Sequence, residues 1–428
     1  MTGKLLILDV AALGHDFLRA AGRLEINGLT FRPAESVFPA VTCTVQASFR
    51  TAAAPAVHGM IANGRFFREL HRCLFWEQSS DLVAGERIWE RFRGRGRRVG
   101  MLFWQQSHGE QVDVLLSPAP IHKHHGGMVQ DCYCRPAGLY PAMKKRLGEF
   151  KLHHYWGPLA GAKAGDWIAA ATAEVMSDPQ LAPELLLAYL PTLDYDLQRW
   201  GPDDPRSAVA MDRLIAQLEM LLVAARSHGY DVLVFGDYAI ARATEVVFPN
   251  RALAETGLLQ TRQVGRRLYA DLHASRAFAM VDHEIAHVFV REKTDVLPTA
   301  ALLSHLPGVE EVLDAPAQAD AGLACPAGGE LVLLAREGAW LAYPWWDRGR
   351  EAPDYASHVD IHNKPGFDPC ELFFGWPPPS VSQDPSRVRG SHGRAGPGRQ
   401  IAWAATFDLG QPEDLLTLSG AVKSTLDS

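Results

Sequence analysis

The sequence predicts an α/β fold with a mostly parallel central sheet. Three continuous apolar runs each lead to an aspartate: KLLILD to Asp9, LLLAYLPTLD to Asp194 and DVLVFGD to Asp237. Buried parallel strands consist of such continuous runs, because both of their faces are covered. Helical patterns lie between the runs, and alternating strands and helices are typical of α/β proteins.

The three aspartates are expected to meet at one edge of the sheet. Open α/β sheets bind ligands outside the carboxyl ends of their strands, where residues distant in sequence converge. An aspartate at a strand end can also cap the helix that follows it. Because Asp9, Asp194 and Asp237 repeat the same placement, the pattern favours a metal site.

Two further elements support the α/β prediction. The run RRVGMLFWQQS indicates another strand near Met101 to Trp104. The segment SAVAMDRLIAQLEMLLVAARSHG predicts an amphipathic helix, with Gly229 suited to its C-terminal end. One face of this helix is expected to carry Val209, Leu214, Leu218, Leu221 and Ala225.

The segment from Arg276 to Tyr343 has a different character. AFAMVDHEIAHVFV reads as a strand, LPTAALLSHLPGVEEVL as a helix and ELVLLAREGAWLAYPWW as a hairpin. We therefore expect a small α+β cap insertion at approximately 276–345, within a single domain that spans 1–428. The later segment PPPSVSQDPSRVRGSHGRAGPGRQ is rich in Pro, Gly and Ser, and its composition alone is typical of a mobile loop.

Composition excludes several classes of function. The chain has 428 residues and a net charge of -7, with 42 Lys and Arg against 49 Asp and Glu, so neither a nucleic acid polymer nor an anionic membrane is an expected partner. No apolar run reaches the roughly 20 residues of a membrane span, and the first residues lack a secretory signal pattern. The six cysteines show no zinc-finger spacing. A cytoplasmic protein with reduced thiols is expected, and its oligomeric state is not readable.

The stretch FPAVTCTVQASFR places two hydroxyl side chains, Thr42 and Thr44, before or inside a predicted helix. A threonine there is usually an N-cap. It can also be a nucleophile, because metal coordination activates a hydroxyl and a helix N-terminus favours a phosphate's negative charge. Two metal ions roughly 4 Å apart can clamp both oxygens of a phosphoryl transfer.

The longer segment VFPAVTCTVQASFRTAAAPAVHGMIAN resembles the nucleophile region of the nucleotide pyrophosphatase/phosphodiesterase branch of the alkaline phosphatase superfamily. The resemblance covers most of the chain and implies a three-layer α/β/α sandwich. With His58 and Gly59 as the anchor, it assigns the nucleophile to Thr42, a turn to Thr51, a proline to Pro55 and the substrate contact to Asn63. Thr44 is then the less favoured nucleophile.

The resemblance also implies two divalent metal ions, with Zn expected. Asp9, Asp194 and Asp237 match its metal-binding aspartates in order, and RGSHGRAG supplies His392 as the last ligand. His362, in HVDIHNKPGFDP, is an alternative or additional ligand. Thr42 itself is also expected to contact metal.

Two imidazoles of the family pattern are missing. DYDLQRWGP has Gln198 where the resemblance implies a histidine, and GDYAI has Tyr238 after Asp237. Gln can ligate weakly through its carbonyl and Tyr as a phenolate, which would suit a harder ion than Zn. Mn or Fe therefore remain alternatives.

The mechanism implied by the resemblance is hydrolysis of a small phosphorylated substrate. Metal held by Asp9 and Asp237 would lower the pKa of Thr42, whose alkoxide attacks phosphorus. A second metal on Asp194 and His392 would neutralise the leaving oxygen, and water would then hydrolyse the phosphothreonine. The alternatives are a phosphonate hydrolase or phosphomutase of the same superfamily, or a non-catalytic descendant that binds a phosphorylated metabolite.

Some chemically suggestive residues are interpreted as structural. In DHEIAH, His283 and His287 would share one face of a strand and are read as partly buried polar residues rather than ligands. His58 is also read as structural. The aromatic run Tyr343, Trp345 and Trp346 could stack on a substrate ring, but such residues more often belong to a core.

Overall fold

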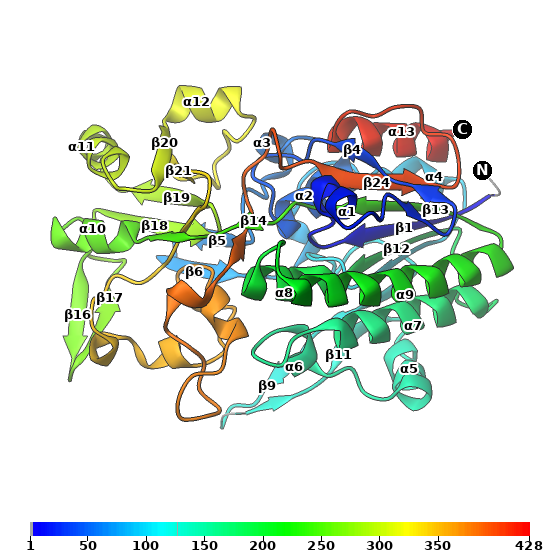
Figure 1. Ribbon diagram of the computed structural model, residues 1–428, viewed down its shortest axis with the longest axis horizontal. Coiled ribbons are helices and arrows are strands. Elements are labelled where there is room, and N and C mark those ends of the chain that lie inside the picture. The colour runs from blue at the N-terminus through cyan, green and yellow to red at the C-terminus, as the bar shows by residue number, and fades with distance from the viewer. Residues whose placement is uncertain (1–2, 126) are drawn as a thin grey trace.

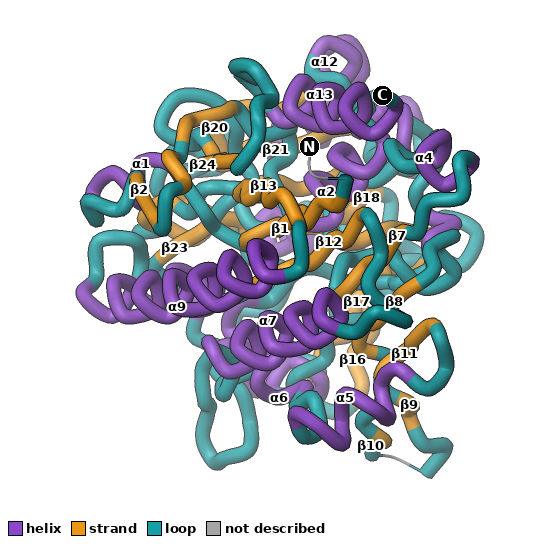
Figure 2. Tube along the Cα trace, turned by 90° about the vertical axis from the view of Figure 1, so that its right-hand side faces the viewer, coloured by secondary structure: helices purple, strands orange, loops and turns teal. Residues whose placement is uncertain are grey.

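The computed structural model describes residues 3–125 and 127–428. It has two lobes side by side, a larger one built on a central sheet and a smaller one formed mainly by residues beyond Glu245 (Figure 1). In the larger lobe, helices α7 (Ala162–Ser177) and α9 (Pro205–Ser227) cover one face of the sheet. Helices α2 (Thr42–Thr51) and α13 (Leu415–Asp427) cover the other (Figure 2). The predicted three-layer α/β/α arrangement is confirmed.

The central sheet is mostly parallel. Within the described residues it has eight strands, in the order β11 (Cys132–Arg135), β8 (Val114–Pro118), β7 (Val99–Leu102), β12 (Leu185–Leu190), β1 (Lys4–Val10), β13 (Tyr230–Gly236), β24 (Ile401–Ala405) and β4 (Arg32–Ala34). The run from β8 to β13 is parallel, and β11, β24 and β4 are antiparallel to their neighbours. The carboxyl ends of β12, β1 and β13 therefore meet at one edge.

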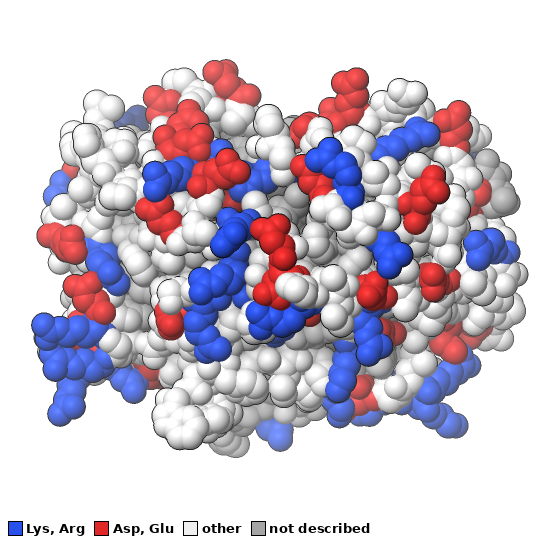
Figure 3. All heavy atoms as spheres, viewed as in Figure 1, with Lys and Arg blue, Asp and Glu red and all other residues white. Residues whose placement is uncertain are grey.

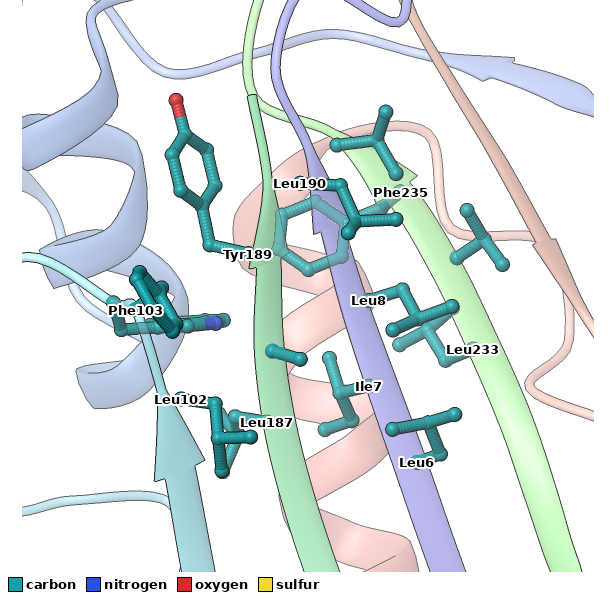
Figure 4. Packing of buried hydrophobic residues seen from close by; sticks show 14 of the residues in the cluster. Leu6, Ile7, Leu8, Leu102, Phe103, Leu187, Tyr189, Leu190, Leu233 and Phe235 are labelled. Atoms are coloured by element: carbon teal, nitrogen blue, oxygen red, sulfur yellow. The ribbon is translucent and has the colours of Figure 1, made fainter. Parts of the chain in front are cut away.

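The core lies along the three apolar runs recognised in the sequence. Ile7 of β1 pairs with Leu187 of β12 on one side and with Leu233 of β13 on the other. Figure 4 shows these side chains packed together against the helical layer. Each is fully buried, which contributes about 1.5–3 kcal/mol per side chain. This packing fixes the register that sets Asp9 level with Tyr189 and Phe235.

The remaining helices of this lobe are short, except for α5 and α8. They are α1 (His15–Ala20), α3 (Pro55–His58), α4 (Glu90–Gly94), α5 (Leu139–Leu147), α6 (Leu152–Tyr155) and α8 (Thr192–Trp200). Short 3₁₀ helices occur at Ser80–Leu82, Gly349–Glu351, Asp354–Ser357, Pro369–Leu372 and Pro385–Arg387.

The long predicted helix is α9, and one residue of its expected apolar face is wrong. Leu214, Leu218, Leu221 and Ala225 are buried, but Val209 is 61% exposed. Ser207 and Ala210 are buried at this end instead, because the helix faces the sheet along a stripe displaced from the expected one. His228 is the C-cap, and Gly229 follows it with a positive φ of 72°.

The smaller lobe is built on a four-stranded antiparallel sheet within the predicted insertion. Its order is β18 (Ala277–Asp282), β19 (Ile285–Val290), β21 (Leu331–Ala335) and β20 (Val309–Leu313). Helices α10 (Pro249–Glu255), α11 (Lys293–Ser304) and α12 (Ala315–Asp320) accompany it. Tyr343, Trp345 and Trp346 are buried in the hydrophobic cluster of this lobe, as the core interpretation expects. The boundaries 276–345 stay a prediction.

Three element assignments in this lobe were wrong. AFAMVDHEIAHVFV forms a hairpin rather than one strand, because the chain reverses at His283 and Glu284 between β18 and β19. LPTAALLSHLPGVEEVL forms the end of α11 and then β20. The predicted hairpin at ELVLLAREGAWLAYPWW is absent from the described residues, since β22 (Ala339–Leu341) pairs in parallel with β15 (Glu245–Val247).

Small two-stranded pairs complete the fold. They are β2 (Glu25–Ile26) with β3 (Leu29–Thr30), β5 (Gly64–Phe67) with β6 (Arg72–Phe75), β9 (Ile121–His122) with β10 (Met128–Val129), β14 (Ala241–Arg242) with β23 (Gly390–Ser391), and β16 (Thr261–Val264) with β17 (Arg267–Ala270). The pairing of β23 matters for the site, because it orders the Pro, Gly and Ser-rich segment that composition assigned to a mobile loop. His392, which follows β23, is 1% exposed.

Charges of both signs are interspersed over the face of the molecule drawn in Figure 3. In the described part of the chain, no helix combines the length and apolar character needed to cross a bilayer.

Candidate active site

A pocket opens at the carboxyl ends of the central strands, where the two lobes meet. It has about 860 Å³ of empty space, part of it open to solvent. The sequence-predicted residues that line it are Thr42, Asn63, Asp194, Gln198, Tyr238, His362 and His392. The other two predicted metal ligands, Asp9 and Asp237, are fully buried and do not line it.

Thr42 is the first residue of α2. Val41, at the N-cap, has no polar side chain that could cap the helix, and Asn63 Oδ1 instead accepts a hydrogen bond of 3.0 Å from the Cys43 amide. The helix N-terminus, with its partial positive charge, therefore stands beside the pocket. Thr44, two residues further along α2, is fully buried and does not line the pocket.

Asp9 is held by the same helix. Gln46, one turn after Thr42, donates from Nε2 to Asp9 Oδ2 at 2.7 Å, and Gln46 Oε1 accepts from the Gln105 amide at 2.7 Å. Asp9 Oδ1 is buried and has no hydrogen-bond partner among the described residues. Burial raises the pKa of Asp9 to about 8, against the lowering effects of the Gln46 hydrogen bond and the Arg50 charge.

Asp237 directly follows β13 and forms a buried acidic pair with Asp9. Its Oδ1 accepts from the amides of Ala12 and Tyr238, at 3.0 and 2.9 Å. Its Oδ2 is buried without a partner in the described parts of the chain. The pKa of Asp237 is raised well above its ordinary value, first by burial and then by the charge of Asp9. Asp9 Oδ1 and Asp237 Oδ2 are thus two buried oxygens of an acidic pair, and neither accepts a hydrogen bond from a described residue.

Asp194 lies in the first turn of α8 and has a different environment. Gln198, one turn further along α8, donates from Nε2 to both Asp194 oxygens, at 2.9 and 2.8 Å. The Tyr238 hydroxyl donates to Asp194 Oδ1 at 2.9 Å. Burial raises the pKa of Asp194 to about 6, and the hydrogen bonds from Gln198 and Tyr238 oppose this rise.

Tyr238 also connects Asp194 to the predicted nucleophile. Its pKa is raised well above the usual value, mainly by burial and by the charges of Asp194 and Asp237, while a hydrogen bond with Thr42 lowers it. The Thr42 hydroxyl therefore lies near the Tyr238 oxygen, and the Tyr238 hydroxyl in turn donates to Asp194.

His392 and His362 occupy different parts of the pocket. His392 is fixed by a 2.8 Å hydrogen bond between its Nδ1 and the Ala40 carbonyl, and burial lowers its pKa well below the usual value. Its ring stacks on Tyr238. His362 is half-buried, with Nδ1 2.9 Å from the Phe75 carbonyl. His58, in contrast, bonds to Ser48 Oγ and the Met60 amide, in agreement with a structural role.

Sequence reasoning missed His283, which lines the pocket although it was set aside as a strand residue. It sits in the turn between β18 and β19 with φ of 61°, a left-handed conformation uncommon outside glycine and asparagine. Its Nδ1 lies 2.7 Å from Asp282 Oδ1, and its buried Nε2 lacks a partner within residues 3–125 and 127–428. His287 is on β19, away from the pocket, and bonds to the Ile61 carbonyl.

Asp282 links the smaller lobe to the predicted substrate contact. It accepts from the Asn63 amide at 2.7 Å and from Asn63 Nδ2 at 3.2 Å. Since Asn63 also accepts from Cys43, the Asn63 side chain spans from the α2 N-terminus to the β18–β19 turn. Such a bridge cannot be recognised in the sequence, because its partners are 219 residues apart.

A buried ion pair holds this turn on the larger lobe. Glu284 Oε1 pairs with Arg399 Nη2 at 2.8 Å, and the Glu284 amide donates to the His392 carbonyl at 2.9 Å. Glu284 and Arg399 are 1% and 5% exposed. The turn that carries His283 and the loop that carries His392 are therefore fastened together.

Aromatic side chains dominate the pocket wall. They are Trp76, Tyr155, Trp156, Tyr189, Tyr195, Tyr238 and Phe367. Tyr189 extends beyond the end of β12, with its hydroxyl directed away from the core (Figure 4). None of the described residues lining the pocket is Lys or Arg. Binding of an anion here would depend on the helix N-terminus and on a bound cation.

The residues present fit the implied metal ions unequally. Asp9 Oδ1 and Asp237 Oδ2 are the orphaned oxygens of a buried acidic pair, which suits a cation. Both oxygens of Asp194 already accept hydrogen bonds, so that side does not fit as arranged. No group of three or more His, Cys, Asp or Glu side chains among the described residues is arranged to hold a metal ion.

Comparison with known proteins identifies the family. The profile described as Type I phosphodiesterase / nucleotide pyrophosphatase matches residues 18–368. The chain belongs to this family. No curated protein sequence matches it. The matched range includes Thr42 and its neighbours.

Solved structures show the same fold at low sequence identity. Murine ectonucleotide pyrophosphatase / phosphodiesterase 5 is 13% identical, with a TM-score of 0.62 over 99% of this chain and 95% of its own. Phosphonoacetate hydrolase from Sinorhizobium meliloti 1021, in complex with phosphonoformate, is 15% identical, with a TM-score of 0.63 over 99% and 96%. These similarities confirm the predicted alkaline-phosphatase-like sandwich.

Proposed function

We propose that this member of the family is a metal-dependent phosphoester hydrolase of the phosphodiesterase type, with Thr42 as its nucleophile. The observation that carries the proposal is the position of Thr42. It begins a helix at the pocket and lies near Tyr238, whose hydroxyl donates to Asp194. Attack by Thr42 Oγ on phosphorus forms a phosphothreonine and breaks the bond to the leaving oxygen. Water then cleaves the phosphothreonine and regenerates the hydroxyl.

The proposed mechanism gives the Thr42 proton a path through Tyr238. It can move to the Tyr238 oxygen as the Tyr238 proton moves to Asp194 Oδ1, which is 2.9 Å away. Asp194 suits the role of acceptor because its pKa is about 6, closer to neutrality than that of an exposed carboxylate. The same three groups hold the nucleophile in place before the reaction.

Two features of the chain would stabilise the negative charge of the phosphoryl group. The N-terminus of α2 directs backbone amides toward the pocket and favours an anion. Asn63, fixed by Cys43 and Asp282, adds an amide group at the same place. Asp9 and Asp237, with Thr42, would hold a divalent cation, and such an ion lowers the pKa of a hydroxyl and neutralises charge during transfer.

The wall of the pocket favours a phosphodiester with a flat group over a carboxylated phosphonate. Aromatic side chains such as Trp76 and Trp156 can stack on a ring. No Lys or Arg lines the described part of the pocket to pair with a second anionic group. In addition, an inactive threonine-to-alanine variant of the murine phosphodiesterase 5 forms a complex with AMP, a ligand with both a phosphate and a flat ring.

The test is the pair Thr42→Ala and Thr44→Ala, assayed on a chromogenic aryl phosphodiester with Mn²⁺ or Zn²⁺ present. Thr42→Ala should lower kcat on the order of 10³-fold, because it removes the nucleophile. Thr44→Ala removes a buried hydroxyl from the same helix and should keep turnover within a few-fold of wild type. Wild-type turnover by Thr42→Ala would refute the mechanism. Binding of phosphoesters without any turnover by the wild-type protein would favour the non-catalytic alternative.

A further inference from the structure

Resting on the proposed function, we infer that this chain binds one divalent cation rather than two, through oxygen ligands of Asp9, Asp237 and Thr42. In place of a second cation beside Asp194, the chain has a hydrogen-bond network made by Gln198 and Tyr238. The inference concerns the number and chemical class of the metal ions, and it departs from the two Zn ions that the resemblance implies.

Both oxygens of the Asp194 carboxylate already accept hydrogen bonds from protein donors. Gln198 Nε2 reaches both of its oxygens, and the Tyr238 hydroxyl reaches one of them. A carboxylate can only accept hydrogen bonds, so the Gln198 amide must turn its nitrogen toward Asp194 and its carbonyl oxygen away. That oxygen, the one atom of Gln198 that could ligate a cation, is therefore directed away from Asp194 and is buried without a described partner.

The donors around Asp194 also oppose a cation electrostatically. The N–H and O–H groups of Gln198 and Tyr238 point the positive ends of their dipoles at the carboxylate. Tyr238 is held in this position, since its ring stacks on His392 and its hydroxyl donates to Asp194. A cation here would have to displace Gln198, reorient Tyr238 and disrupt the stacking.

The Asp9 side is compensated only in part, because its donors reach one oxygen of each carboxylate. Asp9 and Asp237 are both fully buried, and each keeps one oxygen free of hydrogen bonds to described residues. Two buried carboxylates that repel each other can ionise together only if positive charge is brought in. Thr42 lies one turn before Gln46 on the same face of α2, and Gln46 contacts Asp9, so this face of the helix is directed toward the acidic pair.

The donor set determines the class of ion. The Asp9 side offers carboxylate and hydroxyl oxygens, and Tyr238 stands where the family pattern has an imidazole. Oxygen-only sites suit hard cations such as Mn²⁺ or Mg²⁺, whereas Zn²⁺ sites are usually built with nitrogen or sulfur ligands. Mn²⁺ should therefore bind in preference to the Zn²⁺ expected from the resemblance.

The experiment counts the metal ions bound per chain without using turnover. Wild type, Asp9→Asn, Asp194→Asn and the double variant Gln198→His/Tyr238→His are stripped with chelator and reloaded with Mn²⁺ or Zn²⁺. After desalting, plasma mass spectrometry measures the bound metal. Asp9→Asn and Asp194→Asn form a matched pair, because each neutralises one buried carboxylate with an isosteric side chain.

Wild type should retain about one equivalent of Mn²⁺, as should Asp194→Asn, while Asp9→Asn should retain almost none. The double variant should approach about two equivalents of Zn²⁺, because it restores two imidazoles and removes the blocking donors. Two equivalents in wild type, or loss of metal from Asp194→Asn, would overturn the inference, as would failure of wild type to take up any metal. One equivalent in a protein with no phosphoesterase activity would support the cation count and reject the proposed function instead.

Discussion

The Tyr238 ring lies parallel to the His392 imidazole, with ring centroids 3.5 Å apart and planes inclined by 1°. This contact joins two segments of the predicted metal site, one after β13 and one after β23. It fixes Tyr238 so that its hydroxyl reaches Asp194, while His392 is held from the other side by the Ala40 carbonyl. The stacked Tyr238 ring thus holds together two segments of the site that a shared metal ion was expected to hold together.

Replacing Tyr238 with Phe should impair catalysis more than folding. The variant keeps the ring and its stacking on His392 but removes the hydroxyl between Thr42 and Asp194. We expect kcat/KM to fall on the order of 10²-fold, the size of a lost proton-transfer group. Steady-state kinetics on an aryl phosphodiester measure the effect.

The control for this variant is Tyr230→Phe. Its hydroxyl is also buried, donating to the Pro183 carbonyl at 2.6 Å, but it lies at the opposite end of β13. It should change stability without changing kcat/KM. Equal activity losses in the two variants would contradict the proposed proton path.

His283 is expected to contact the substrate. Burial raises the pKa of Asp282 only to about 6, so at neutral pH it is a carboxylate that accepts from His283 Nδ1, which leaves Nε2 as a hydrogen-bond acceptor. Burial keeps the pKa of His283 well below its ordinary value, so the ring stays neutral. His283→Phe should lower kcat/KM by about tenfold, equivalent to one lost hydrogen bond of about 1.4 kcal/mol.

A second histidine of the same hairpin provides the comparison for His283. His287 is fully buried, and its ring nitrogens are near the Ile61 carbonyl and the Gly329 amide rather than the pocket. His287→Gln should lower the thermal midpoint and leave kcat/KM unchanged. If His283→Phe and His287→Gln behave alike, His283 is only a structural residue of the turn.

The buried acidic pair should make the cation-free protein sensitive to pH. The pKa of Asp9 rises from an unfolded value of about 3.9 to about 8 in the fold, so the folded state binds more protons between these values. The stabilising contribution of the protonated carboxyl is fully present below about pH 4. It is lost as the pH rises through about 8.

Denaturant unfolding of chelator-treated protein at several pH values tests this expectation. The free energy of unfolding should include a component that falls between about pH 4 and pH 8, and Asp9→Asn should flatten that component. A saturating divalent cation should restore stability at the upper end of the range, where protons no longer compete for the carboxylates. An identical pH profile in wild type and Asp9→Asn would show that Asp9 is not responsible.

Much of the fold could be predicted from local patterns. The apolar runs at Ile7, Leu187 and Leu233 form adjacent parallel strands, because a strand buried on both faces needs a continuous apolar sequence. The cap was predicted less well: the reversal at His283 has no glycine or asparagine to mark it, so the hairpin read as a single strand.

The sequence by itself determined that an aspartate accompanies each of three apolar strands and that Thr42 stands before or inside a helix, and the resemblance marked Gln198 and Tyr238 as replacements for imidazoles. Only the tertiary structure decided what each carboxylate meets: two donors at Asp194, one at Asp9, and a neighbouring acid at Asp237. Strand periodicity depends on neighbouring residues and can be read locally. Hydrogen-bond partners and buried charge depend on packing between segments far apart in the chain, such as Asn63 with Asp282, and they follow only from the folded arrangement.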